Sequence, residues 1–221
     1  MDSDTCRLDI ISEIGRYKIA ICPGHYPDSP GAKSHWHFRG IDYIMNEHTE
    51  ALKVIEYLYY NLRDKSFMTV EIFNGTLEKK VEGINKYHPH LALEVHFNSH
   101  ADSDAHGCEV LHSGTAKSID IAERIQRRLV EILKREDRGT KVGYYEGNTE
   151  KGMLYYLKKT KCPAIIIEPL FLSNLNDAGL LFSLQGHIKI ESAIRLGIND
   201  YIITKHRRYK EYTRKLSHDK S

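Results

Sequence analysis

Residues 163–168 read PAIIIE, and this run gives the strongest indication of the fold class. Its apolar residues follow one another without a polar interruption, which is typical of a strand buried on both faces of a sheet. The run ends in a single carboxylate, Glu168. A carboxylate at such a position is costly to bury without a partner, so the sequence predicts an ion pair or a bound cation beside it.

Further strands and helices alternate around this run. Short apolar or β-rich runs predict strands at 16–22, 67–73, 91–97 and 108–112. Apolar residues at helical spacing predict helices at 47–63, 77–84, 119–133, 152–159, 176–184 and 188–201, and residues 23–43 read as a loop. The alternation predicts an α/β fold, with a single domain built on a central mixed, mostly parallel sheet of about six strands and with helices on both faces.

The length and charge of the chain indicate how many domains it forms and which partners it could attract. The chain has 221 residues and a formal net charge of +2. We predict one folded domain at 16–203, preceded by an N-terminal extension at 1–15 and followed by a basic tail at 204–221. From Lys205 to Ser221 the chain carries seven Lys or Arg and two Asp or Glu. Such a tail is either a solvated terminus, which is the more common case, or a segment attracted to an anionic surface such as a cell-wall polymer. The small overall charge gives no argument for a nucleic-acid partner, and it does not specify an oligomeric state.

Neither a membrane span nor a secretion signal is predicted from the sequence. No run approaches the roughly 18 apolar residues that a spanning helix needs. The first residues, MDSDTCRLDIISEIGRYK, lack a basic region followed by an apolar one. We therefore expect synthesis in the cytoplasm without a recognisable signal peptide.

Polar residues capable of metal chemistry follow several of the predicted strands. His25 follows the first strand, His96 lies in the third, Glu168 ends the last one, and Glu47 opens the first long helix. Functional groups gather at such strand ends in α/β sheets. Two imidazoles and a carboxylate are a recurring ligand set for catalytic zinc, and a further carboxylate can then act on a bound water. The residues alone leave other ligands open, namely His35, His37, His100 and Glu50, whereas His48 is adjacent to Glu47 but points elsewhere.

Taken together, these motifs resemble a known family, the zinc N-acetylmuramoyl-L-alanine amidases of type 3, found in bacterial autolysins and phage endolysins. The matching segments are PGH at 23–25, NEHTEAL at 46–52, EVHFNSH at 94–100, DRGTKVG at 137–143, PAIIIEPLFLSN at 163–174 and IKIESAIRLGINDYI at 188–202. The resemblance covers about residues 18–201, and the segment at 163–174 is its most specific part. Tyr26 and Pro27 stand where the family usually has glycines, so the rim of the binding groove must differ.

The resemblance implies a metal site and a reaction. By position, His25, Glu47 and His96 become ligands of one Zn²⁺ ion, and Glu168 becomes the catalytic acid and base. The implied reaction is hydrolysis of the amide between N-acetylmuramic acid and L-alanine in bacterial peptidoglycan. Without a secretion signal, such an enzyme acts on the cell wall after release, which fits a phage-type endolysin.

Two other classes of function remain open at the level of sequence. One is a zinc peptidase or carboxypeptidase on a related sheet, in which Arg138 would grip a free carboxylate. The other is a non-catalytic module that binds the cell wall, for which Glu168 would be dispensable. A third possibility, nucleic-acid binding through the basic tail, is disfavoured because only Tyr209 and Tyr212 accompany its charges.

Overall fold

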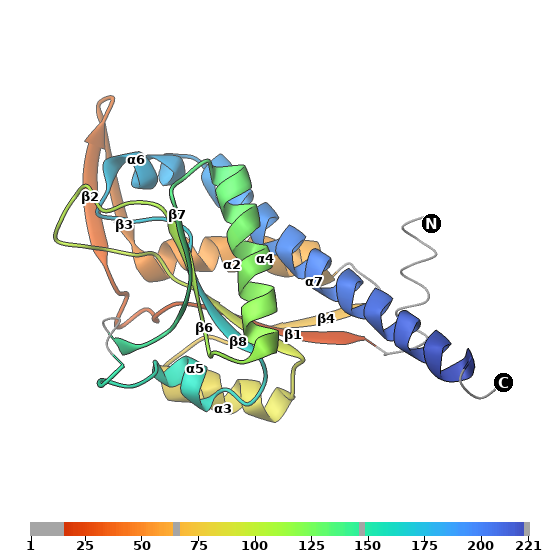
Figure 1. The fold of residues 1–221 in the computed structure, drawn as a ribbon. Coiled ribbons are helices and arrows are strands. Elements are labelled where there is room, and N and C mark those ends of the chain that lie inside the picture. Colours follow the sequence, from red (N-terminus) through yellow and green to blue (C-terminus); the bar gives the residue numbers. More distant parts are fainter. Residues whose placement is uncertain (1–15, 64–66, 146–148, 219–221) are drawn as a thin grey trace.

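A six-stranded sheet forms the centre of the computed structural model, which describes residues 16–63, 67–145 and 149–218. The strand order is β4-β1-β5-β8-β6-β7. β1, β4, β5 and β8 run parallel, whereas β6 is antiparallel to β8 and parallel to β7. This confirms the predicted single-domain α/β fold with a mixed, mostly parallel sheet (Figure 1).

Helices and strands follow one another along the chain as expected for such a fold. The strands are β1 (Tyr17–Pro23), β2 (Lys33–Phe38), β3 (Ile41–Asn46), β4 (Met68–Ile72), β5 (Leu91–Val95), β6 (Cys108–His112), β7 (Asp137–Val142) and β8 (Ala164–Glu168). The helices are α2 (Glu47–Arg63), α3 (Leu77–Tyr87), α4 (Ala116–Leu133), α5 (Tyr155–Lys159), α6 (Leu175–Ala178), the 3₁₀ helix η2 (Gly179–Phe182) and α7 (Leu184–His218).

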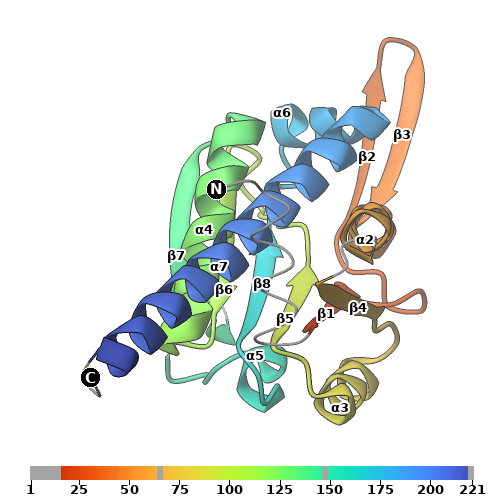
Figure 2. The ribbon, with the colours of Figure 1, turned by 90° about the vertical axis from the view of Figure 1, so that its right-hand side faces the viewer.

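The two faces of the sheet carry different cores. Alternate residues of a strand point to opposite faces. Ile19 and Ile21 of β1 therefore join a large cluster with α2, α4 and α7, while Ala20 and Cys22 join a smaller one with α3 and α5. Figure 2 shows α4 and α7 on one side of the sheet and α3 on the other. The strand residues beneath α3 and α5 are mostly small, so these helices form a thin layer.

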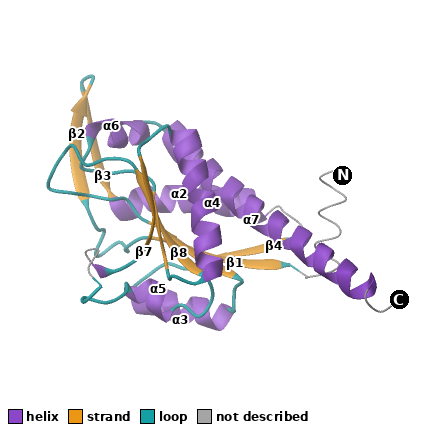
Figure 3. Cartoon of the chain, in the orientation of Figure 1, coloured by secondary structure: helices purple, strands orange, loops and turns teal. Residues whose placement is uncertain are grey.

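The structure corrects the prediction of a loop at 23–43. Residues 33–46 form the antiparallel hairpin β2–β3, which Figure 3 shows projecting from the sheet near α6. Most of its residues are exposed, Ile41 and Ile44 among them, so its apolar residues do not mark a buried face. Its inner face packs through Tyr43, whose ring stacks on Phe182 at 4.0 Å between centroids. Trp36 also donates to the backbone oxygen of Leu172 at 3.2 Å.

Three further expectations differ from the structure. Residues 137–142 form the edge strand β7, which the polar sequence DRGTKV does not suggest. The helix expected at 176–184 is divided into α6 and η2. The last helix does not end near Tyr201 but continues to His218, so residues 204–218 of the predicted tail extend α7 (Figure 1). The predicted extension at 1–15 lies outside the described residues. Within the described chain, no helix is both long and apolar enough to span a bilayer.

The topology brings three sequence-distant segments to one edge of the sheet. β1, β5 and β8 are adjacent and parallel, so their carboxyl ends meet there. Because β6 runs in the opposite direction, its first residues also reach this edge, and Glu109 pairs with Glu168 across the ladder. In open α/β sheets this is the edge where binding sites form.

Candidate metal centre

His25 is placed by a sharp turn at the end of β1. The backbone N–H of Gly24 donates to the oxygen of Val95 at 2.6 Å, which keeps the turn against β5. A Cβ atom at Gly24 would lie 2.7 Å from the ring of His96, so only glycine allows this approach. His25 itself has a φ of 57°, a left-handed conformation that is uncommon for a residue with a side chain. Its imidazole is thereby directed at the start of α2.

Glu47 is the first residue of α2, and its carboxylate lies almost fully buried between the two histidines. Its Oε2 is 3.1 Å from His25 Nε2, and its Oε1 is 2.7 Å from His96 Nδ1. The backbone N–H groups of Ala32 and Phe97 donate to the two oxygens at 3.0 and 3.2 Å. Burial alone would raise the pKa of Glu47, but the hydrogen bonds from both histidines lower it well below its ordinary value. The carboxylate is therefore ionised.

His96 completes the cluster from the residue after β5. The ligand atoms of His25, Glu47 and His96 all lie within 4.8 Å of one another, and no other such group is found in the described chain. His96 uses both ring nitrogens, since Nε2 lies 3.2 Å from Oε2 of the buried Glu94. Burial lowers the pKa of His96, but Glu94 and Glu47 together raise it above its ordinary value. The structure thus brings together the three residues chosen from the sequence.

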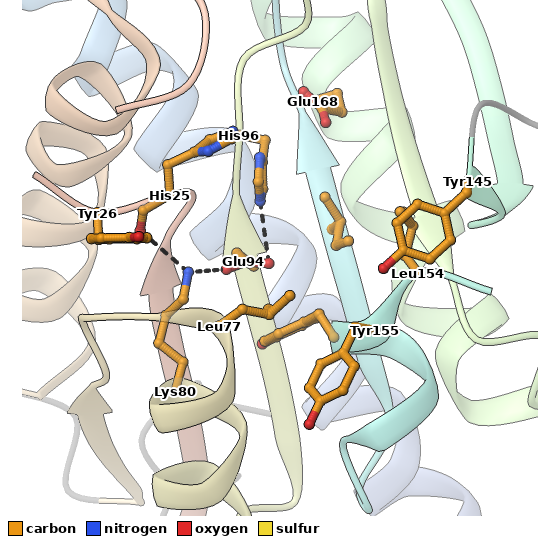
Figure 4. Close-up of a pocket in the computed structure, with 12 residues that line it drawn as sticks. His25, Tyr26, Leu77, Lys80, Glu94, His96, Tyr145, Leu154, Tyr155 and Glu168 are labelled. Atoms are coloured by element: carbon orange, nitrogen blue, oxygen red, sulfur yellow. Dashed lines mark hydrogen bonds and ion pairs between the residues drawn. The ribbon is translucent and has the colours of Figure 1, made fainter. Parts of the chain in front are cut away.

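Glu168 ends β8 and lines the same pocket as His25 and His96 (Figure 4). Its Oε2 atom is buried and has no hydrogen-bond partner. Burial raises the pKa of Glu168 to about 8, and the carboxylates of Glu47, Glu109 and Glu94 add to this effect against the opposing charge of His96. Such a shift is common among groups that exchange protons during catalysis.

The pocket extends from the histidines toward α3 and α5. Its volume is about 290 Å³. Its remaining wall is mainly aromatic and aliphatic, formed by Tyr26, Tyr145, Tyr155, Tyr156, Leu77, Leu154 and Ile166. The floor carries the charged pair Lys80 and Glu94, as Figure 4 shows. The site therefore combines a polar cluster with an apolar cleft, which suits an elongated substrate.

The other histidines and glutamates considered as ligands have separate partners. His35 and His37 both contact Asp42 on the exposed hairpin, at 3.2 and 2.9 Å. Glu50 pairs with His187 of α7 at 2.7 Å. His48 contacts the backbone oxygen of Gly24, and His100 accepts from the backbone of Asp102. None of them joins the cluster.

Arg138, which a carboxypeptidase would use to bind the free carboxylate of its substrate, also has local partners. Its Nε donates to Glu109 at 3.3 Å, its Nη1 reaches the oxygen of His106, and its guanidinium lies over the ring of Phe171. Lys141 shares the same Glu109 oxygen at 2.5 Å. Arg138 is not among the residues that line the pocket.

Sequence reasoning missed Lys80 and Glu94. Both side chains are about 2% exposed. Glu94 did carry a signal, because a carboxylate in the middle of LALEVHF must be buried and must have a cationic partner. Lys80 carried a signal as well, because its spacing of three residues from Leu77 and four from Ile84 places it on the apolar face of its helix.

An α/β sheet that gathers two imidazoles and a carboxylate at its carboxyl edge, beside a further carboxylate, is an arrangement typical of metal-dependent hydrolases. The chain belongs to the N-acetylmuramoyl-L-alanine amidase family, whose sequence model matches residues 19–200. This confirms the family indicated by the motifs.

Relatives in that family share parts of this chain. An uncharacterized cell wall amidase of Bacillus anthracis is 31% identical over an alignment of 135 residues; the match covers 57% of this chain and 24% of that protein. N-acetylmuramoyl-L-alanine amidase LytC of Bacillus subtilis is 29% identical over 129 residues, with the same coverage. The chain thus spans about a quarter of the length of these two relatives.

Solved structures share the fold across nearly the whole domain. The crystal structure of N-acetylmuramoyl-L-alanine amidase from Clostridium difficile 630 superposes with a TM-score of 0.72. The match covers 85% of this chain and 97% of that one, at 20% sequence identity. This likeness independently supports the α/β architecture described above.

Proposed function

We propose that this protein is a zinc-dependent amidase that cleaves the bond between N-acetylmuramic acid and L-alanine in peptidoglycan. The observation that carries the proposal is the convergence of His25, Glu47 and His96 beside Glu168, in a chain of this family. The two curated relatives named as amidases support the substrate class.

The residues at the site fit a divalent cation. Two imidazoles and one ionised carboxylate are a usual donor set for zinc with an open fourth position. A Cβ atom at Gly31 would collide with the Glu47 carboxylate and the His25 ring, so the backbone is shaped closely around the donors. Glu168 Oε2 is buried without a partner, and a nearby cation would offset the cost of its charge. His25, Glu47 and His96 would hold the ion.

Each residue of the site then has a distinct task. Bound zinc would supply Lewis acidity, polarising the scissile carbonyl and lowering the pKa of water. The Glu168 carboxylate accepts a proton from the attacking water and returns one to the amine nitrogen of L-alanine as the bond breaks. The aromatic and aliphatic wall of the pocket binds the substrate and excludes water from the reacting groups.

The decisive experiment follows the newly freed amino group of L-alanine from purified peptidoglycan. We expect release by the wild type, loss after chelation, recovery with zinc, and loss in Glu168→Gln while zinc stays bound. Glu50→Gln is the matched control, because Glu50 is equally buried on the same helix as Glu47 but contacts none of the four site residues.

Two results would replace the proposal with one of its rivals. Cleavage of simple peptides with no action on peptidoglycan would indicate a zinc peptidase. Zinc and wall binding without any cleavage, unchanged in Glu168→Gln, would indicate a binding module.

We also propose that the enzyme reaches the wall after release from the cytoplasm, as endolysins do. Its presence in the medium of intact, growing producer cells would contradict that route.

A further inference from the structure

A buried ion pair lies directly beneath the metal cluster. Lys80 of α3 pairs with Glu94 Oε1 of β5, and both side chains are only about 2–3% exposed. Glu94 turns its other oxygen, Oε2, to His96 Nε2 at 3.2 Å. Figure 4 shows dashed lines that join Lys80 to Glu94 and Glu94 to His96. The pair is therefore continuous with a candidate metal ligand.

Stability alone is a weak reason for this pair. Burying two charges is costly, and well-packed apolar residues often replace such a pair without loss of stability. Lys80 is also far from its partner in sequence and belongs to a different element. A second role that depends on the charges themselves is a better account of their presence.

The ammonium of Lys80 contacts the turn that carries His25. It donates to the backbone oxygens of Pro23 at 3.0 Å and His25 at 3.4 Å. Together with Glu94, these acceptors match the three N–H donors of a lysine. The two carbonyl oxygens lie on either side of the Gly24 turn, next to the left-handed backbone of His25. Lys80 thus holds that turn in place.

Glu94 orients the other histidine, His96, through a contact with one of its two ring nitrogens. His96 Nδ1 faces Glu47 and the cluster, whereas Nε2 faces Glu94. A carboxylate on Nε2 favours the tautomer with its proton there, which leaves the lone pair of Nδ1 free for a cation. The same contact fixes the plane of the ring.

We propose that Lys80 and Glu94 are positioning residues of the metal centre, one ion pair that orients both histidine ligands. The proposal rests on the zinc site of the proposed function. Glu94 sets the tautomer and ring plane of His96, and Lys80 fixes the turn of His25 while keeping Glu94 in place. Neither residue coordinates the ion.

The test measures zinc affinity by competition with a chromogenic chelator, in the full chain. The central variant is the double substitution Lys80→Met with Glu94→Gln, which removes one positive and one negative charge. The net charge near the ion is thus unchanged, and the variant leaves no unpaired buried charge that would prevent folding. We expect zinc to bind about 10–100-fold more weakly, as is typical for loss of such outer contacts.

Two further measurements separate orientation from general damage. Glu50→Gln, which removes an equally buried carboxylate, should keep wild-type zinc affinity. Nitrogen NMR of the histidine rings in the zinc-free protein, at a pH where His96 is neutral, should show its Nε2–H tautomer in the wild type and a mixture of tautomers in the double variant. A merely structural pair would alter neither the tautomer nor the affinity selectively.

The outcomes distinguish this inference from the function on which it rests. If the wild type binds zinc and the folded double variant binds it equally well, the positioning role is wrong and the amidase proposal stands. If the wild type binds no zinc, both fail. If Glu50→Gln weakens zinc as much as the double variant does, the effect is general destabilisation and the positioning role is again wrong.

Discussion

Replacing Glu168 with glutamine should stabilise the zinc-free protein as the pH rises. The pKa of Glu168 is raised from 4.5 to about 8 in the folded chain, first by burial and then by neighbouring carboxylates. Below about pH 4.5 the group is neutral in both states and has no effect. Between the two pKa values the unfolded chain loses the proton and the folded chain keeps it, so stability falls as the pH rises. Above about pH 8 the cost is fully present.

The size of this cost follows from the two pKa values. Each pKa unit corresponds to about 1.36 kcal/mol, so the difference between 4.5 and about 8 gives an upper limit of about 5 kcal/mol. Glu168 faces an open pocket, and water there screens part of the charge. We therefore expect Glu168→Gln to be more stable than wild type by about 2–4 kcal/mol at about pH 8, and by close to zero at about pH 4.5.

Urea denaturation of both chelated proteins across this pH range measures the effect. Adding zinc should shrink the difference, because a cation beside Glu168 stabilises its charged form. Glu50→Gln is a control of opposite sign, since His187 and Lys53 lower the pKa of Glu50 despite its burial. That variant should lose stability and show no gain at high pH. Parallel pH curves for wild type and Glu168→Gln without zinc would refute the reasoning.

Three other predictions address separate parts of the molecule. Gly31→Ala should weaken zinc binding at least tenfold in a chelator competition. Its Cβ would collide with the Glu47 and His25 side chains, and its φ of 74° is a backbone conformation that disfavours any residue but glycine. Unchanged affinity would contradict the described geometry. Ending the chain after Lys205 removes six Lys or Arg and two Asp or Glu. Binding to anionic cell walls, measured by sedimentation, should therefore become weaker and lose its dependence on salt concentration. Far-UV circular dichroism should show that the shortened domain is still folded. Thr115→Ala should lower the free energy of unfolding by about 1 kcal/mol in urea, since its side chain caps α4 at the N–H of Ser118; no change would mean that water replaces the cap.

The parts of the fold predicted from sequence are those with a buried face. The helix at 47–63 was predicted with its observed bounds because Leu58 and its apolar neighbours recur at helical spacing. The strand of 163–168 was identified because it is buried on both faces. The edge strand β7 was missed because its sequence is polar. The hairpin β2–β3 was missed because most of its residues, including the apolar Ile41 and Ile44, are exposed and therefore do not alternate between a buried and a solvated face. The length of α7 was missed because its last turns are mostly charged or polar and carry few apolar residues, although Tyr209, Tyr212 and Leu216 recur at helical spacing.

The candidate site, too, could be predicted from the sequence only in part. Strand ends alone drew attention to His25, His96 and Glu168, since topology gathers such residues at one edge. The choice of these over His35 or His100 came from the family resemblance, because no local spacing separates them. That choice, and the assignment of zinc, remain predictions that the metal and activity measurements test. The pairing of Lys80 with Glu94 depends on how α3 packs across β5, which the sequence does not encode locally.

The small residues on one face of the sheet give the metal centre an unusual vulnerability. Ala20, Cys22 and Ala92 lie in the same cluster as Val81 and Ile84, the buried apolar residues of α3 that follow Lys80 in sequence. The bulk of these strand residues therefore sets the distance of α3 from the sheet, and with it the position of the Lys80 ammonium. Substitutions that enlarged them in order to raise thermal stability would move α3 away from the sheet. The proposed ligands would lose alignment although none of them had been changed.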